Sequence, residues 1–164
     1  MPGDPRSAIP HRPPFLLLDE IVEESDHFVL ARAVPRPEDE LWSRIYAGHY
    51  PGNPITPGAL LCEMLFQAAA IMTGRLAVEL GLSGVPMVTR IQEAKFKSAV
   101  FPGDELLVQA ELVERLANAF FMKGRVQKNG RTAMEAKFSV ALANSRPISA
   151  PRLTRQMGDI SPNG

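Results

Sequence analysis

The sequence of 164 residues lacks several features that would assign it to a class at once. It contains one cysteine, so no disulfide can form within the chain. Cys62 lies in an apolar run, where a reduced thiol usually packs as a small hydrophobe. No Gly-rich phosphate loop follows a strand, and no set of cysteines and histidines has the spacing of a zinc site. The sequence therefore predicts no metal site.

An excess of charge of one sign is also missing, because 18 lysines and arginines balance 18 aspartates and glutamates. We therefore expect no nucleic-acid partner. The N-terminus has no basic segment followed by an apolar stretch, which predicts no secretory signal and residence in the cytoplasm. The longest apolar run, residues 59–72, is interrupted by Glu63 and Gln67 and is shorter than the roughly 20 residues of a membrane span. We expect no membrane insertion.

What is present is the pattern of one domain with a single long helix. The apolar fraction of 45% is enough for a core. A helical pattern covers residues 59–80, and Gly81 can end it. Within its first four turns only Glu63 and Gln67 are polar, four residues apart and so on one face. Because a helix that is apolar nearly all round is a buried helix, residues 59–80 predict the centre of the core.

The segments after this helix read as long strands. They are residues 87–100, 104–116, 118–130 and 131–143, with an earlier strand at residues 26–35. Asn129-Gly130 predicts a two-residue hairpin turn between the last two. Residues 36–46 read as a loop or a short helix. We expect an α+β domain over residues 1–144, with an antiparallel sheet wrapped around the helix, and a flexible tail over residues 145–164.

The segment GHYPGNPITPGALLCEMLFQ places a histidine in a loop rich in proline and glycine just before the helix. Burial disfavours a charged carboxylate, so Glu63 is expected to have a raised pKa and to hold a proton near neutral pH, as a general acid must. Neutral His49 can accept a proton, because the pKa of imidazole is about 6.5. Pro57 has no N–H, so Gly58 supplies the first free amide of the helix, where an anion can bind.

An acid, a base and an anion site together suit dehydration of a 3-hydroxyacyl thioester. The spacing leaves open whether His49 and Glu63 meet within one chain or across a dimer. Both also have a structural interpretation, in which His49 is a loop residue and Glu63 is a helix residue bonded to Gln67. We expect His11, in the N-terminal arm, and His27, at the start of a strand, to be structural.

Three segments in this order closely resemble the (3R)-hydroxyacyl-[acyl carrier protein] dehydratases of bacterial fatty-acid synthesis. They are IPHRPPFLLLDEI, GHYPGNPITPGALLCEMLFQ and KFKSAVFPGDELLV. The similarity covers residues 9–143 and implies the hot-dog fold, in which a curved antiparallel sheet wraps a central helix. It also implies a homodimer whose sheets join edge to edge and whose active sites are shared between subunits. A ring of three such dimers stays open.

The same resemblance implies a role for each residue of the motif. His49 would remove the α-proton, and Glu63 of the partner subunit would protonate the 3-hydroxyl. The Gly58 amide would hold the thioester oxygen, and Gln67 would support the carboxylate. Glu63, where related isomerising dehydratases usually have Asp, favours simple dehydration. No cofactor is required, because the elimination needs only proton transfers and stabilisation of an oxyanion.

The chain departs from the family pattern around the histidine. The stretch LWSRIYAGHY carries Trp42, Arg44 and Tyr46 where Asn, aromatic residues and Gly are common, and Thr56 replaces a more usual Met. These departures leave open a non-catalytic acyl-binding subunit of the same fold. A thioesterase of the same fold is a further alternative.

Substrate and partner also follow from the resemblance. The acyl chain is expected in an apolar tunnel. Candidate lining residues are Met64, Phe96 and Phe101. The acidic acyl carrier protein is expected to dock on a basic rim. Candidate docking residues are Arg90, Lys95 and Lys97.

Overall fold

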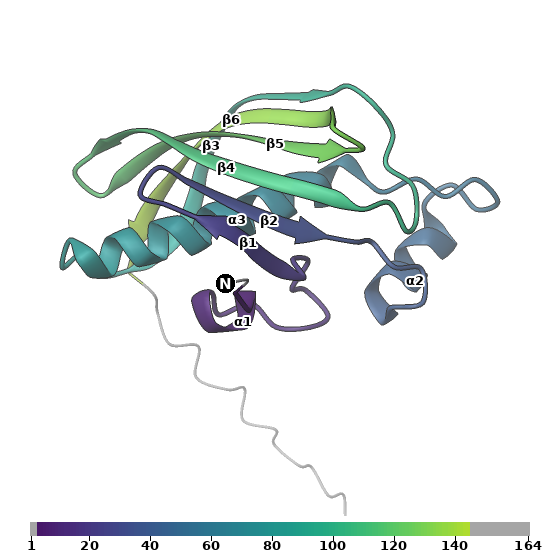
Figure 1. Cartoon of the computed structure of the whole chain (residues 1–164), viewed down its shortest axis with the longest axis horizontal. Helices are drawn as coiled ribbons and strands as arrows, with labels where there is room; N and C mark the ends of the chain where they lie inside the picture. Colours follow the sequence, from purple (N-terminus) through teal and green to yellow (C-terminus); the bar gives the residue numbers. More distant parts are fainter. Residues whose placement is uncertain (1–2, 145–164) are drawn as a thin grey trace, which may run out of the picture.

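The computed structural model describes residues 3–144, in which six strands form one antiparallel sheet over a long helix (Figure 1). The strands are β1 (Glu20–Glu24), β2 (Phe28–Ala33), β3 (Val85–Phe96), β4 (Leu106–Leu116), β5 (Ala119–Lys128) and β6 (Arg131–Ala143). Their order across the sheet is β1-β2-β4-β5-β6-β3. The helices are α1 (Pro5–Ala8), α2 (Glu40–Gly48) and α3 (Gly58–Glu79). This is the expected α+β hot-dog fold, while the predicted tail, residues 145–164, lies outside the described residues.

Helix α3 is the core of the fold. It starts directly after Pro57 and stops at Leu80, where Gly81 has a φ of 63°, a left-handed conformation that suits glycine. By length and composition α3 is apolar enough to cross a membrane, yet half of its 22 residues are buried within the fold. Its apolar character therefore reflects packing under the sheet.

The sheet approaches α3 closely at Gly124. A Cβ atom at this position would lie 2.6 Å from the carbonyl oxygen of Gln109 and 2.7 Å from Cδ1 of Leu65. Ala110 and Ala136 pair with Gly124 on the neighbouring strands and are buried beside it. A row of small residues thus lets the helix lie close against the sheet.

The predicted hairpin joins β5 and β6. Asn129 and Gly130 have φ values of 51° and 72°, the left-handed pair that a two-residue turn of this kind requires. Residues 36–46, for which the sequence left a loop or a short helix open, contribute to helix α2. This helix buries Trp42 and Tyr46 and leads directly to His49.

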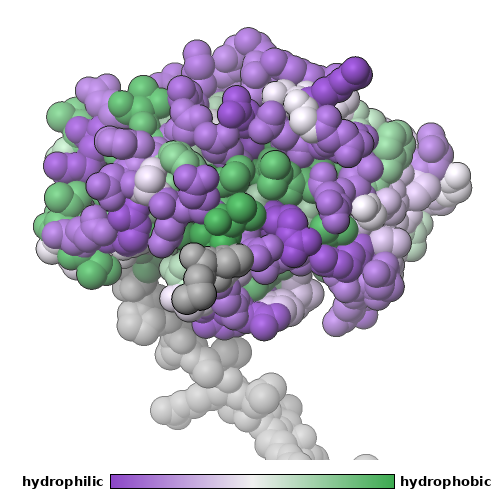
Figure 2. Space-filling model, viewed as in Figure 1, coloured by the Kyte–Doolittle hydropathy of each residue, from purple (hydrophilic) through white to green (hydrophobic). Residues whose placement is uncertain are grey.

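Strand β3 leaves one edge of the sheet without a partner in the single chain, because it pairs only with β6. Its apolar side chains are largely exposed, with Met87 at 53%, Ile91 at 48% and Phe96 at 55%. The long apolar edge of β3 is typical of a strand that pairs with another chain. Seen from the side of β1 and β2, the surface in Figure 2 is hydrophilic along the upper rim and exposes hydrophobic residues in the middle of the view.

Candidate active site

His49 follows the last turn of α2 and is held by two hydrogen bonds to backbone carbonyls. Its backbone N–H donates to Ile45 O at 2.7 Å, and its Nδ1 lies 2.8 Å from Ile55 O. A carbonyl oxygen only accepts hydrogen bonds, so Nδ1 carries the hydrogen. In the neutral imidazole, Nε2 therefore keeps a free lone pair. This tautomer is the one that a general base needs.

The loop after His49 is fixed by a tight turn and by a bond to a distant segment. Tyr50 and Gly52 have φ values of 60° and 83°, and Asn53 N–H donates to Tyr50 O. The Tyr50 ring meets the His49 ring edge-on, with centroids 4.6 Å apart. Thr56 N–H donates to Val100 O at 2.8 Å, which ties the loop to the chain that follows β3.

His49 lines a groove of about 550 Å³ that also contains the start of α3. Leu60 and Leu61 donate the first hydrogen bonds of the helix, both to Pro57 O, so the Gly58 amide precedes them. A Cβ atom on Gly58 would lie 2.7 Å from the ring of Phe96. Glycine therefore lets the Phe96 ring pack directly against the helix start, where the free amides carry the positive partial charge that favours an anion.

Glu63 lies elsewhere, in a pocket of about 290 Å³ between α3 and the start of β3. Its neighbours there include His11, Phe66 and Met87. The side chain is 23% exposed, so the expectation of a carboxylate buried within its own chain is wrong. The reason is that Glu63 points to the side of α3 that the chain's own sheet leaves uncovered beside the free edge of β3.

Gln67 anchors the Glu63 carboxylate and is itself fully buried. Its Oε1 accepts from Leu17 N–H at 2.9 Å, which fixes the orientation of the amide. Nε2 then donates to Phe15 O at 2.8 Å and to Glu63 Oε1 at 3.0 Å. The expected pairing of Gln67 with the carboxylate is therefore present, and it ties Glu63 to the N-terminal arm.

His11 lies near the carboxylate, a position that the sequence did not indicate. Its Nε2 lies 3.9 Å from Glu63 Oε1, and its buried Nδ1 has no hydrogen-bond partner within residues 3–144. The ring stacks on Phe15, with centroids 6.3 Å apart. The sequence signal for this contact was the segment IPHRPPFLLLDEI, which contains His11. The same segment supplies the backbone groups that bind Gln67. His27 lies far along the chain from both pockets and lines neither.

The structure thus separates the two groups in a single chain. The groove of His49 does not include Glu63, and the pocket of Glu63 does not include His49. Strand β3 borders both, because Phe96 lines the first and Met87 the second. One chain therefore offers a base at one end of β3 and a carboxylate at the other.

The candidate tunnel residues do not lie together. Phe96 lines the His49 groove, whereas Met64 is fully buried under the sheet. The Phe101 ring lies beneath the ammonium of Lys128, 5.1 Å from it, and lines neither pocket. Of the three, Phe96 alone is placed beside the candidate base.

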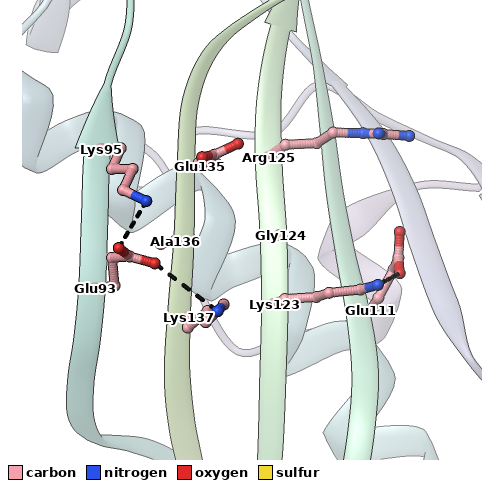
Figure 3. A pocket seen from close by; sticks show the side chains of 9 residues that line it. All are labelled: Glu93, Lys95, Glu111, Lys123, Gly124, Arg125, Glu135, Ala136 and Lys137. Atoms are coloured by element: carbon pink, nitrogen blue, oxygen red, sulfur yellow. Dashed lines mark ion pairs between the residues drawn. The ribbon is translucent and has the colours of Figure 1, made fainter.

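The candidate docking residues lie on β3 and just beyond it. Lys95 and Lys97 are paired, with Glu93 at 2.7 Å and Glu135 at 2.8 Å, whereas Arg90 is exposed and enters no ion pair within the described residues. Figure 3 shows Lys95 and Glu93 at the edge of a shallow pocket on the outer face of the sheet, whose floor is formed by Gly124 and Ala136. Opposite charges alternate around it. The ion pair lowers the pKa of Glu93 and raises that of Lys95.

Comparisons with known proteins agree on one family. Residues 9–137 match the FabA-like domain. The chain is 34% identical over 134 residues to the 3-hydroxyacyl-[acyl-carrier-protein] dehydratase FabZ of Enterococcus faecalis, covering 82% of this chain and 92% of that protein. It is 33% identical over 142 residues to the FabZ of Anaeromyxobacter dehalogenans, covering 85% and 88%.

Solved structures share the fold at lower identity. The dehydratase heterocomplex ApeI:P from Xenorhabdus doucetiae matches with a TM-score of 0.73 and 19% identity, covering 87% of this chain and 92% of that one. A hypothetical thioesterase with coenzyme A from Streptococcus pneumoniae matches with a TM-score of 0.57 and 18% identity, covering 77% and 86%. Both likenesses concern the fold alone.

Proposed function

The chain belongs to the FabA-like family, which includes the FabZ dehydratases, and on this premise we propose that it dehydrates (3R)-hydroxyacyl-[acyl carrier protein] to trans-2-enoyl-[acyl carrier protein] in fatty-acid biosynthesis. The observation that carries the proposal is the hydrogen bond from His49 Nδ1 to Ile55 O. It leaves Nε2 as a proton acceptor beside the free amide of Gly58 in one groove.

The reaction follows from these positions. His49 Nε2 takes the α-proton of the thioester, and the electron pair moves onto the thioester oxygen, which the Gly58 amide stabilises. The enolate then re-forms the carbonyl and the new double bond as the C3–O bond breaks. Glu63 protonates the departing hydroxyl, which leaves as water. A proton returned from His49 to Glu63 restores both groups.

Gln67 decides which oxygen of Glu63 carries the proton. Its Nε2 donates to Oε1, so Oε1 is an acceptor and the proton resides on Oε2. Oε2 is therefore the oxygen that faces the hydroxyl of the substrate. The anchor also limits rotation of the carboxyl group, which keeps the acid in one geometry.

We infer that the site is completed in a homodimer formed through the free edges of β3. Phe96, beside His49, and Met87, beside Glu63, lie at opposite ends of the strand. An antiparallel pairing of two β3 strands about a two-fold axis near the middle of the strand would bring the Met87 end of the partner's β3 beside the Phe96 end of this one. The partner's Glu63 would then face this chain's His49, in two equivalent sites.

The same pairing accounts for substrate and environment. It would cover the exposed apolar side chains of β3 and the carboxylate of Glu63, giving the dry surroundings that a protonated acid requires. The acyl chain would lie along this interface, with Phe96 as one wall. The acidic acyl carrier protein would deliver the acyl chain to this groove in the cytoplasm, and Arg90, which enters no ion pair within residues 3–144, would be available to a negative partner.

Dehydration is tested by mixing the purified protein with a short 3-hydroxyacyl substrate and following the absorbance of the enoyl product. We expect turnover by the wild type and its loss in His49→Ala and Glu63→Gln. Equal background rates for all three proteins would contradict the proposal. Release of free thiol without enoyl product would instead indicate a thioesterase.

Sharing of sites between subunits is tested by subunit complementation. His49→Ala and Glu63→Gln, each inactive alone, are unfolded together and refolded at equal concentration. Half of the dimers should then be mixed, and each mixed dimer contains one intact site of two, so about a quarter of the wild-type activity should return. If acid and base acted within one chain, every site would lack one group and no activity would return.

A further inference from the structure

Two residues that depart from the family pattern are each other's partner in this structure. The hydroxyl groups of Tyr46 and Thr56 lie 2.7 Å apart, a hydrogen bond between two side chains that are 7% and 3% exposed. Trp42 stacks on the Tyr46 ring, with centroids 5.7 Å apart, and closes the phenol in. Burial raises the pKa of Tyr46, so the group remains a neutral hydroxyl.

This hydrogen bond lies next to both bonds that hold His49. The backbone of His49 binds Ile45, the residue before Tyr46, and its imidazole binds Ile55, the residue before Thr56. The Tyr46–Thr56 bond therefore joins the last turn of α2 to the segment that accepts the Nδ1 hydrogen. Together the three bonds hold His49 between the last turn of α2 and the segment of Ile55 and Thr56.

We propose that the Tyr46–Thr56 hydrogen bond positions the base, by holding Ile55 O where it selects the Nδ1–H tautomer of His49. The inference rests on the dehydratase function proposed above and assigns a role there to two residues that touch no reacting atom. Thr56 also donates its backbone N–H to Val100 O, so the pair is tied to the segment between β3 and β4.

A purely structural role would give different consequences. The bond lies in the interior, so removing one hydroxyl leaves the other without its partner, whereas removing both with isosteric side chains leaves an apolar contact. If the bond only stabilised the fold, kcat would fall with the loss of stability, wherever in the protein a buried hydroxyl was removed. If the bond positions the base, its loss changes the tautomer of His49 and lowers kcat, while KM stays nearly constant.

The experiment uses Thr56→Val, Tyr46→Phe and the double variant in the full-length protein. Thr56→Val should lower kcat about tenfold, with KM changed less than about twofold. Tyr46→Phe should lower kcat less, because the smaller Thr56 hydroxyl can rotate toward another acceptor. The double variant should recover part of the loss. Thr73→Val is the matched control, since it removes a buried hydroxyl bonded to Ala69 O within α3, away from the site.

The second measurement does not depend on turnover. Nitrogen-15 chemical shifts of the His49 ring report which nitrogen carries the hydrogen. The wild type and Thr73→Val should hold the Nδ1–H form, and Thr56→Val should show a mixture with the Nε2–H form. An unchanged tautomer in Thr56→Val, or equal losses of kcat in Thr56→Val and Thr73→Val, would overturn the inference. A wild type that holds the Nδ1–H form but does not dehydrate would instead overturn the proposed function.

Discussion

Replacing Gln67 with Met tests the anchor of the acid most directly, because the two side chains have nearly the same volume. The change removes three hydrogen bonds at once, from Leu17 N–H, to Phe15 O and to Glu63 Oε1. The Leu17 amide is buried and loses its partner, at a cost of about 1–3 kcal/mol, while the other two bonds contribute about 0.5–1.5 kcal/mol each. The free energy of unfolding should therefore fall by about 2–6 kcal/mol.

That loss is a large part of the stability of a domain this size, about 5–15 kcal/mol. The assay is urea unfolding followed by far-ultraviolet circular dichroism, at one protein concentration because association adds to the apparent stability. Gln109→Met is the matched control, since Gln109 bonds Arg125 on the outer face of the sheet. It should cost less than about 1 kcal/mol.

Activity gives a second reading of the same variant. Without its anchor the Glu63 carboxyl can rotate, so kcat should fall about tenfold to a hundredfold in the protein that remains folded. A loss of stability below about 1 kcal/mol, together with an unchanged kcat, would refute the hydrogen-bonded anchor. Loss of stability with unchanged kcat would leave Gln67 as a packing residue only.

Three further outcomes follow. Gly124→Ala should lower the free energy of unfolding by about 1–3 kcal/mol, because its Cβ meets Gln109 O and Leu65, whereas Gly74→Ala, with open space around it, should raise it by about 0.5–1 kcal/mol. Burial raises the pKa of Cys62 above its ordinary 9.0, so unfolding measured from pH 7 to 10 should show stability falling above about pH 9 more steeply than in Cys62→Ala. Specific activity should fall on dilution in step with dimer dissociation measured by light scattering; activity independent of association would contradict a shared site.

The long helix and the hairpin were predictable because local chemistry alone sets them. Pro57 and Gly81 bound α3 almost where the sequence placed it, and Asn129-Gly130 gave the turn between β5 and β6. Residues 36–46 were ambiguous because charged and polar residues outnumber the apolar ones. The helix there is fixed by burial of Trp42 and Tyr46, which periodicity over so short a stretch does not reveal.

The residues of the candidate site could be proposed from the sequence, whereas their surroundings could not. The apolar pattern of α3 indicates that the helix is covered all round, and it does not say by which chain. Glu63 lies on the side that the chain's own sheet leaves open, so the expected burial was wrong for a single chain. The approach of His11 joins residues about fifty positions apart, a contact that spacing cannot predict. The catalytic roles themselves stay predictions.

The prolines of the loop have a chemical use beyond stiffness. A carbonyl in an irregular segment can accept a hydrogen bond from the backbone N–H two residues later, as in a γ-turn. After Ile55 the second residue is Pro57, which has no N–H, and the N–H of Thr56 is directed to Val100 O. The Ile55 carbonyl therefore stays available to the imidazole. Proline at this position thus supplies His49 with its acceptor by removing the nearest competing donor, which explains why the loop and the base belong to one motif.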